Sequence, residues 1–188
     1  MMFVGREKEL KELEERYSRG DAQLVVLYGK RRLGKTALLR EFARNKAHLF
    51  YVSRDTIDSE QIRLFSQEVL KDSPVGEYLA SFDSWEKAFR FLSHEARGKR
   101  ILLIIDEFPY MAQNNREFLS ILQNVWDQEE EESRLMLVLT GSSLSFMEDQ
   151  VLGEESPLYG RTSASIRLEA LTFREAARIL PGFSLEHQ

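Results

Sequence analysis

The sequence predicts an α/β fold in which a doubly wound parallel sheet of about five strands has helices on both faces. Three observations support this prediction. Short apolar runs recur along the chain, segments with helical spacing of apolar residues lie between them, and the first run leads directly into a glycine-containing loop. Strands that alternate with helices imply right-handed crossovers, and continuous apolar runs are typical of strands that are covered on both faces.

Amphipathic spacing predicts the helices in the first half of the chain, because apolar residues recur every three or four positions. In the first helix, for example, Leu10, Leu13 and Tyr17 share one face. Apolar runs predict the strands, and the sequence Ser-Pro-Val-Gly at 73–76 ends the third helix. The predicted elements are helix 7–19, strand 24–28, helix 35–45, strand 48–53 and helix 59–71.

The second half of the chain continues the alternation. Asp83 is the predicted N-cap of a helix, and Glu86 is placed to complete a capping box. The run 101–105 is apolar throughout and ends at two carboxylates, which is typical of a buried parallel strand. Thr172 is the predicted N-cap of a last helix. The predicted elements are helix 83–97, strand 100–105, helix 116–129, strand 134–139, a short helix through 150, a loop at 153–160, strand 163–168 and helix 172–180.

The loop after the first strand has the pattern Gly29-x-x-x-x-Gly34-Lys35-Thr36, the phosphate-binding loop in its required setting between a strand and a helix. The glycines let the backbone turn tightly, so that successive N–H groups form a nest for phosphate oxygens at the positive end of the helix. Lys35 would reach the β- and γ-phosphates, and Thr36 would bind Mg²⁺. The predicted nucleotide-binding residues of the loop are Gly29, Lys30, Arg31, Arg32, Leu33, Gly34, Lys35, Thr36 and Ala37.

Arg31 and Arg32 make this loop more basic than phosphate binding requires. Three roles stay open for them at this point: pairing with carboxylates, contact with the nucleotide, or contact with a partner.

Asp106 and Glu107 follow the buried strand, at the edge of an open α/β sheet where ligands bind. Asp106 would hold Mg²⁺, directly or through water, opposite Thr36. Glu107 would act as the base that polarises a water for in-line attack, which a hydrolytic enzyme needs and a kinase does not. The chain between Lys35 and Asp106 leaves space for one extra strand between the loop strand and the acidic strand, and 48–53 can fill it.

Two later segments carry further candidate catalytic residues. Thr140 and Ser142 lie at the end of a predicted strand, where a hydroxyl would sense the γ-phosphate or hold the attacking water; an ordinary strand-to-helix turn is the alternative. Arg161 follows a loop and is a candidate arginine finger, acting on its own nucleotide or on a neighbour's; a solvated arginine is the alternative.

Composition excludes several classes of function. The chain has no cysteine, so it has no disulfides or thiolate metal sites, and its histidines are isolated, which argues against metal binding by them. A net charge of −5 does not support binding to nucleic acid, although a local basic patch remains possible. No apolar run approaches the roughly 20 residues of a membrane span. We therefore expect a cytoplasmic protein without membrane contact.

Together these segments resemble the archaeal-type ATPase family, which belongs with the signal-transduction ATPases with numerous domains and is related to the AAA+ class. The resemblance implies that Val4, Gly5 and Arg6 lie near the adenine, with Arg6 toward the phosphates, and that the acidic strand does not follow the loop strand directly in sequence. Members usually continue into a helical or winged-helix domain and often a nuclease-like domain. We expect residues 1–188 to be a single ATPase core domain without these parts. The matching segments are 3–10, 29–36, 101–108, 140–143 and 157–161.

The sequence therefore predicts a domain that binds ATP or ADP with Mg²⁺, hydrolyses ATP, and couples nucleotide state to conformation or assembly. A nucleotide-binding signalling switch with negligible turnover and the ATPase module of a DNA-associated protein are the alternatives. A small-molecule kinase is disfavoured, because Glu107 adjoins Asp106 and no arginine-rich lid is present. Expected partners are ATP and either further copies of the chain or another protein; DNA stays open but has no support from the net charge.

Overall fold

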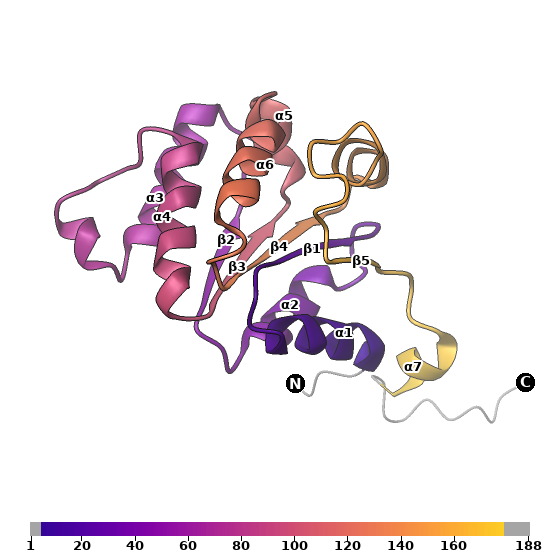
Figure 1. The fold of residues 1–188 in the computed structure, drawn as a ribbon. Coiled ribbons are helices and arrows are strands. Elements are labelled where there is room, and N and C mark those ends of the chain that lie inside the picture. The colour runs from indigo at the N-terminus through magenta and orange to yellow at the C-terminus, as the bar shows by residue number, and fades with distance from the viewer. Residues whose placement is uncertain (1–4, 179–188) are drawn as a thin grey trace, which may run out of the picture.

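A five-stranded, wholly parallel sheet with the order β2-β3-β4-β1-β5 forms the centre of the molecule (Figure 1). The structure is a computed structural model, and it describes residues 5–178. The predicted doubly wound α/β fold is confirmed. The strands are β1 (Gln23–Tyr28), β2 (His48–Val52), β3 (Ile101–Asp106), β4 (Leu135–Gly141) and β5 (Ala164–Arg167).

The order of the strands brings three chain segments to one edge of the sheet. β2 comes between β1 and β3 in sequence, as expected, but in the sheet β4 separates β1 from β3 while β2 lies at the outer edge beside β3. Thr140 and Gly141, which were expected in a turn, are the last residues of β4 and lie beside Leu27 and Tyr28 of β1. Because all strands are parallel, the segments that follow β1, β3 and β4 meet at the same edge.

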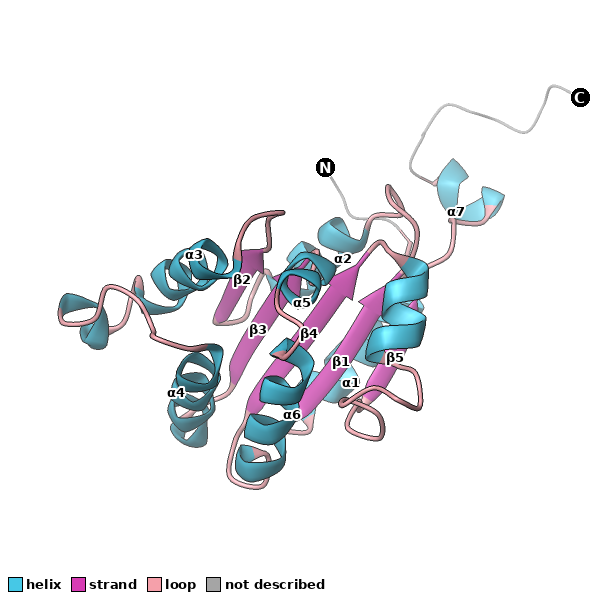
Figure 2. Ribbon diagram, turned by 90° about the horizontal axis from the view of Figure 1, so that it is seen from above, coloured by secondary structure: helices cyan, strands magenta, loops and turns pink. Residues whose placement is uncertain are grey.

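Helices cover both faces of the sheet (Figure 2). The core therefore has two layers: Leu13, Leu38 and Phe42 pack on one face, and Phe65 and Trp85 belong to the layer on the other. A 3₁₀ turn (Pro74–Glu77) follows α3, and a π-helical turn (Phe146–Val151) follows β4. The helices are α1 (Glu7–Ser18) and α2 (Lys35–Ala43) on the first face, α3 (Asp58–Leu70), α4 (Trp85–Gly98), α5 (Pro109–Asn114) and α6 (Phe118–Glu129) on the second, and α7 (Phe173–Ala177) after β5.

The central strands are buried because their side chains alternate between these two layers. In β1, Leu24 and Val26 belong to the layer of α3 to α6, whereas Val25 and Leu27 belong to the layer of α1 and α2. All four side chains are fully buried. A strand that is covered on both faces has no polar side, which explains the continuous apolar run in its sequence.

An aromatic cluster anchors α6 beneath the end of β3. The ring of Phe118 lies 5.0 Å from that of Trp85, 5.8 Å from that of Phe89 and 5.7 Å from that of Phe108, and Phe118 is fully buried. Edge-to-face pairs of this kind add stability beyond that of the buried area. Since Phe108 directly follows Glu107, the same cluster supports the backbone that carries the predicted base.

The structure corrects the predicted cap of α4 and confirms the predicted cap of α7. Ser84, not Asp83, caps α4: its extended backbone lets the hydroxyl accept a hydrogen bond from the N–H of Lys87, while Asp83 pairs with the Lys87 ammonium. Glu86 consequently forms no capping box and pairs with Arg90. The short helix α5, which begins at a proline, was not predicted. The capping box at Thr172 is confirmed, and residues 179 and 180 of that predicted helix lie outside the described residues.

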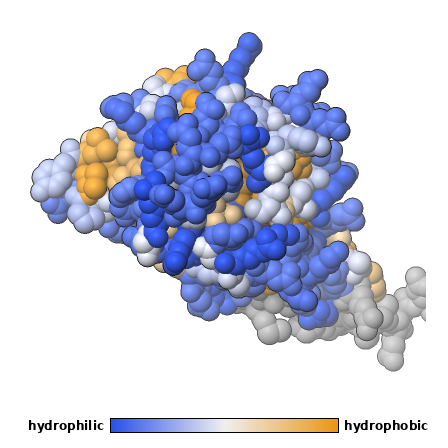
Figure 3. Space-filling view, viewed as in Figure 1, coloured by the Kyte–Doolittle hydropathy of each residue, from blue (hydrophilic) through white to orange (hydrophobic). Residues whose placement is uncertain are grey.

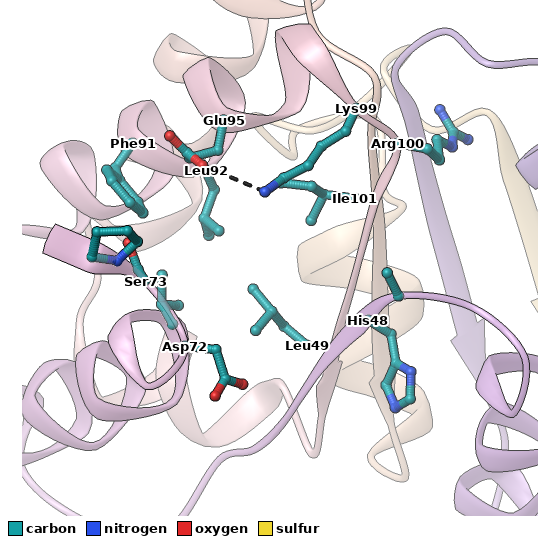
Figure 4. A pocket seen from close by; sticks show the side chains of 13 residues that line it. His48, Leu49, Asp72, Ser73, Phe91, Leu92, Glu95, Lys99, Arg100 and Ile101 are labelled. Carbon is teal, nitrogen blue, oxygen red and sulfur yellow. Dashed lines mark ion pairs between the residues drawn. The ribbon is translucent and has the colours of Figure 1, made fainter. Parts of the chain in front are cut away.

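The outer surface over α4 and α6 is mostly hydrophilic (Figure 3). No helix within residues 5–178 is long and apolar enough to cross a membrane. A cavity of about 300 Å³ lies where β2 and β3 begin, with apolar walls that include Leu49 and Leu92 (Figure 4). Lys99 and Glu95 form an ion pair of 3.6 Å at this cavity. It lies at the edge of the sheet opposite the phosphate-loop residues and is not the candidate site.

Replacing Phe118 by alanine should lower the free energy of unfolding by about 3–5 kcal/mol, because the change removes a fully buried ring and leaves a cavity among other aromatic side chains. Chemical denaturation followed by circular dichroism measures this change. Tyr78→Ala is the control, since Tyr78 is 89% exposed. A loss below about 1 kcal/mol for Phe118→Ala would contradict the central role of the cluster.

Candidate functional site

The loop between β1 and α2 has the backbone conformation of an anion-binding nest. Gly34 (φ 88°) and Arg32 (φ 66°) adopt the left-handed conformation, and alternation of this kind turns successive N–H groups toward one point. Gly29 cannot be replaced without displacing its neighbour, because a Cβ there would lie 2.4 Å from the carbonyl oxygen of Leu168. The loop therefore depends on contact with the segment after β5 as well as on its own glycines.

Lys35 is the buried cation of this loop, with 6% of its surface exposed. Its Nζ donates hydrogen bonds to the carbonyl oxygens of Gly29 (2.8 Å) and Lys30 (3.0 Å). Burial lowers the pKa of the Lys35 ammonium, and the nearby carboxylates of Glu107 and Asp106 oppose this shift. An ammonium that is held mainly by neutral carbonyl groups is placed to bind an incoming anion.

Thr36 and Asp106 meet across the sheet edge. The Thr36 hydroxyl donates a hydrogen bond of 2.6 Å to Asp106 Oδ2, and Asp106 Oδ1 accepts one of 3.1 Å from the N–H of Glu107. A hydroxyl and a carboxylate oxygen are ligands that Mg²⁺ prefers. Within residues 5–178 no group of three or more metal-binding side chains occurs. The pair therefore fits an ion whose other ligands are phosphate oxygens and water.

Glu107 has the left-handed backbone conformation (φ 52°), which costs a non-glycine residue about 1 kcal/mol. Its two carboxylate oxygens accept hydrogen bonds from the Ser142 hydroxyl at 3.2 and 3.0 Å. The hydroxyl of Thr140, in contrast, is buried beneath the edge and has no hydrogen-bond partner among residues 5–178. Of the two hydroxyls that were equivalent in the sequence, the structure brings Ser142, and not Thr140, to the predicted base.

Ser53 supports this backbone and was not predicted from the sequence. Its hydroxyl lies 2.8 Å from the carbonyl oxygen of Asp106 and 2.6 Å from that of Glu107, and its single proton is shared between them. Its N–H also donates to the Asp106 carbonyl at 2.9 Å. A polar residue directly after an apolar strand is the signal that could have identified Ser53, as it identified Asp106 and Thr140.

A buried hydrogen-bond network holds the segment after Ser53. Gln61 accepts from the Tyr51 hydroxyl (2.7 Å) and from the N–H of Arg54 (3.2 Å), and donates to the carbonyl of Arg54 (2.7 Å). Burial raises the pKa of Tyr51 to about 12, so its hydroxyl remains a donor at neutral pH. The side chain of Asp58 accepts from Trp85 of α4 at 2.8 Å. The network therefore joins the end of β2 to α3 and α4.

Arg6 links the start of the chain to the phosphate loop. Its guanidinium donates to the carbonyl oxygens of Leu33 (3.1 Å) and Glu169 (2.5 Å), and pairs with Glu9 at 3.1 Å. Its side chain therefore binds loop main chain, next to the position expected for phosphates. Gly5 packs beside Leu171 with left-handed geometry. Val4, the third residue of this prediction, lies outside the described residues.

Arg161 is not brought to these residues. Its guanidinium forms two bonds of 2.5 and 2.6 Å to Asp127 of α6. The N–H of Ser163 bonds to the carbonyl of Leu24, so Arg161 lies where β1 and β5 begin. The six residues of β1 separate that edge from the phosphate loop by about 20 Å. This placement contradicts action of Arg161 on its own nucleotide; action on a neighbour's nucleotide stays a prediction.

The fold and the loop together define a P-loop nucleoside triphosphatase fold, with one strand between the phosphate-loop strand and the acidic strand. The chain belongs to the family described as "ATPase domain predominantly from Archaea", whose model matches residues 3–187. This confirms the family that the sequence segments resemble.

Curated relatives come from Methanocaldococcus jannaschii. The uncharacterized protein MJECL04 is 33% identical over 180 residues, which are 96% of this chain and 38% of that protein. The uncharacterized protein MJ1637 is 26% identical over 178 residues, which are 94% of this chain and 32% of that protein. The chain thus spans about a third of the length of these relatives.

Solved structures with the same fold include the Walker-type ATPase PABY2304 of Pyrococcus abyssi, with a TM-score of 0.70, 22% identity and coverage of 94% of this chain and 56% of that chain. The Aeropyrum pernix ORC1 protein, solved in complex with DNA, has a TM-score of 0.67, 19% identity and coverage of 95% and 49%. At this level of identity the likeness establishes the fold.

Replacing Ser53 by alanine should lower the free energy of unfolding by about 1–3 kcal/mol, because it removes a buried donor from two main-chain carbonyl groups. Ser53→Thr keeps the hydroxyl and should lose less. Ser18→Ala is the matched control, since its hydroxyl makes an exposed bond to the Glu14 carbonyl. Chemical denaturation measures all three variants, and equal values for Ser53→Ala and Ser18→Ala would refute the supporting role of Ser53.

Proposed function

We propose that this domain is a Mg²⁺-dependent ATPase that couples its nucleotide state to conformation or assembly. The observation that carries the proposal is the hydrogen bond of 2.6 Å between Thr36 and Asp106, with Glu107 as the next residue and Lys35 in the loop beside it. Membership of an ATPase family supports the same reaction. The activity is proposed for the domain, since the relatives that match are longer.

In the proposed mechanism the loop N–H groups and Lys35 bind the β- and γ-phosphates. Lys35 leaves the carbonyls of Gly29 and Lys30 for this purpose, and the Thr36 hydroxyl and the Asp106 carboxylate would hold Mg²⁺ between them. The ion supplies charge neutralisation on the phosphate oxygens. Glu107 accepts the proton of the attacking water, and its hydrogen bond from Ser142 orients the carboxylate. Phosphoryl transfer to water requires positioning of the reactants and stabilisation of charge more than covalent chemistry by the protein.

A nucleotide-binding switch with little turnover is the second candidate. It is favoured by the Lys35 ammonium, which donates to the carbonyl oxygens of Gly29 and Lys30 and has to leave them before it can bind phosphate. Phosphate release in a single turnover separates a switch from an enzyme.

We also propose the cytoplasm as the location and either another copy of the chain or a second protein as the partner. The lack of cysteine fits a reducing compartment. DNA is a further candidate, because the Aeropyrum pernix ORC1 structure was solved with DNA, but the net charge of −5 argues against it. Stimulation of ATP hydrolysis by DNA, lost at raised salt, would support this candidate.

Two variants test the proposed reaction because they should behave differently. Lys35→Ala should abolish ATP binding, since the loop then lacks its buried cation. Glu107→Gln should bind MgATP as the wild type does but hydrolyse it at least about 100-fold more slowly, because the base is lost. Calorimetry measures binding, and phosphate release measures turnover. Normal binding by Lys35→Ala, or normal turnover by Glu107→Gln, would disprove the corresponding assignment.

Arg161→Ala tests action across an interface. If Arg161 stabilises charge on a neighbour's nucleotide, wild-type specific activity should rise with protein concentration, and the variant should lose about 10³-fold in turnover at high concentration. Asp127→Ala is the control, because it removes the ion-pair partner of Arg161 and leaves the arginine in place. A specific activity that is independent of concentration would argue against this role.

A further inference from the structure

The tip of the phosphate loop carries three exposed basic residues, Lys30, Arg31 and Arg32. Within residues 5–178 none of their side chains forms an ion pair with a carboxylate. Of the three roles left open by the sequence, pairing with carboxylates of the described chain is therefore removed. Contact with the nucleotide and contact with a partner remain.

The side chain of Arg31 extends from the phosphate loop toward α5. Its Nη2 donates a long hydrogen bond of 3.4 Å to the hydroxyl of Tyr110. Tyr110 lies in the first turn of α5, and its N–H bonds to the carbonyl oxygen of Glu107 at 3.1 Å. The guanidinium thus lies between the phosphate loop and the segment that carries the predicted base. A single long bond to a neutral hydroxyl holds it only weakly.

Lys35 and Arg31 belong to the same loop segment, and each is held by uncharged oxygens. Lys35 donates to the carbonyl oxygens of Gly29 and Lys30, and Arg31 donates to the hydroxyl of Tyr110. The arrangement of these two cations therefore favours an anionic ligand that reaches both side chains.

We propose that Arg31 is a catalytic residue that contacts the γ-phosphate of the nucleotide bound to its own chain. This inference rests on the proposed ATPase function. Two other arginines cannot take this position in the same chain: Arg6 is bound to the carbonyls of Leu33 and Glu169, and Arg161 lies at the opposite edge of the sheet. The guanidinium turns from Tyr110 to the phosphate, a movement that breaks one long hydrogen bond.

Arg31 stabilises charge and transfers no proton. Water oxygen forms a bond to the γ-phosphorus, the bond from phosphorus to the leaving ADP oxygen breaks, and the water proton goes to Glu107. Negative charge spreads over the oxygens of the transferred group in this transition state, and a guanidinium presents several N–H donors to it. The arginine should therefore contribute more to the rate than to ground-state binding.

The test compares Arg31→Ala with the wild type in single-turnover cleavage of MgATP and in calorimetric binding of a non-hydrolysable ATP analogue and of ADP. Cleavage should slow by about 10²-fold or more, analogue binding should weaken only a few-fold, and ADP binding should be unchanged. Arg31→Lys should recover only part of the rate, because an ammonium lacks the planar fork. Arg54→Ala is the matched control: it removes an exposed arginine that follows β2 at the same edge, and should cleave ATP at the wild-type rate.

The outcomes separate this inference from the function on which it rests. If the wild type hydrolyses ATP, Glu107→Gln does not, and Arg31→Ala cleaves ATP at the wild-type rate, the ATPase proposal stands and the proposed role of Arg31 is wrong. Equal weakening of analogue and ADP binding with an unchanged rate also overturns it. A mixture of the Arg31→Ala and Lys35→Ala variants tests whether Arg31 acts within its own chain. Recovered activity in the mixture would mean that Arg31 of one chain acts on the nucleotide bound to another. If the wild type cleaves no ATP, the ATPase function itself fails.

Discussion

Parallel pairing of the strands is the constraint on which the rest of this molecule depends. Because β1, β3 and β4 run in the same direction, the residues that follow them meet at one edge of the sheet. The hydrogen bond from Thr36 to Asp106 spans that edge, over the end of β4. An antiparallel β4 would place Ser142 at the other edge and leave Glu107 without its hydrogen-bond donor.

The polar groups of the edge are held by a buried frame that takes no part in the proposed chemistry. Ser53 binds the main chain of Asp106 and Glu107, while Gln61 fixes the segment that follows Ser53. The aromatic ring of Phe108 packs on Phe118 below. Buried polar groups are costly unless they are paired, so this frame permits few alternative conformations of the base.

Cations are distributed unevenly around the candidate site, and their burial separates their roles. Lys35 is buried and bound by loop carbonyls, and Arg6 is buried and bridges the loop to the segment after β5. Arg31 is exposed and weakly held. Arg6 maintains the loop through its main-chain partners, and Lys35 exchanges its carbonyl partners for phosphate in the proposed mechanism. The exposed and loosely held Arg31 can follow a ligand. The contact between Leu168 and Gly29 also ties the loop to the chain that leads to α7.

The sequence by itself determined the fold class, the loop from Gly29 to Thr36, the two carboxylates and the Thr172 cap, because strand burial, glycine geometry and helix capping are local properties of the chain. Only the tertiary structure decided three other features. These are the identity of the strand between β1 and β3, the hydroxyl that reaches Glu107, and the edge of the sheet at which Arg161 lies. These outcomes depend on pairing between distant segments. Thr140 and Ser142 are close in sequence, yet one stays inside the sheet beside β1 and the other leaves it after Gly141. The supporting role of Ser53 likewise exists only because β2 lies beside β3.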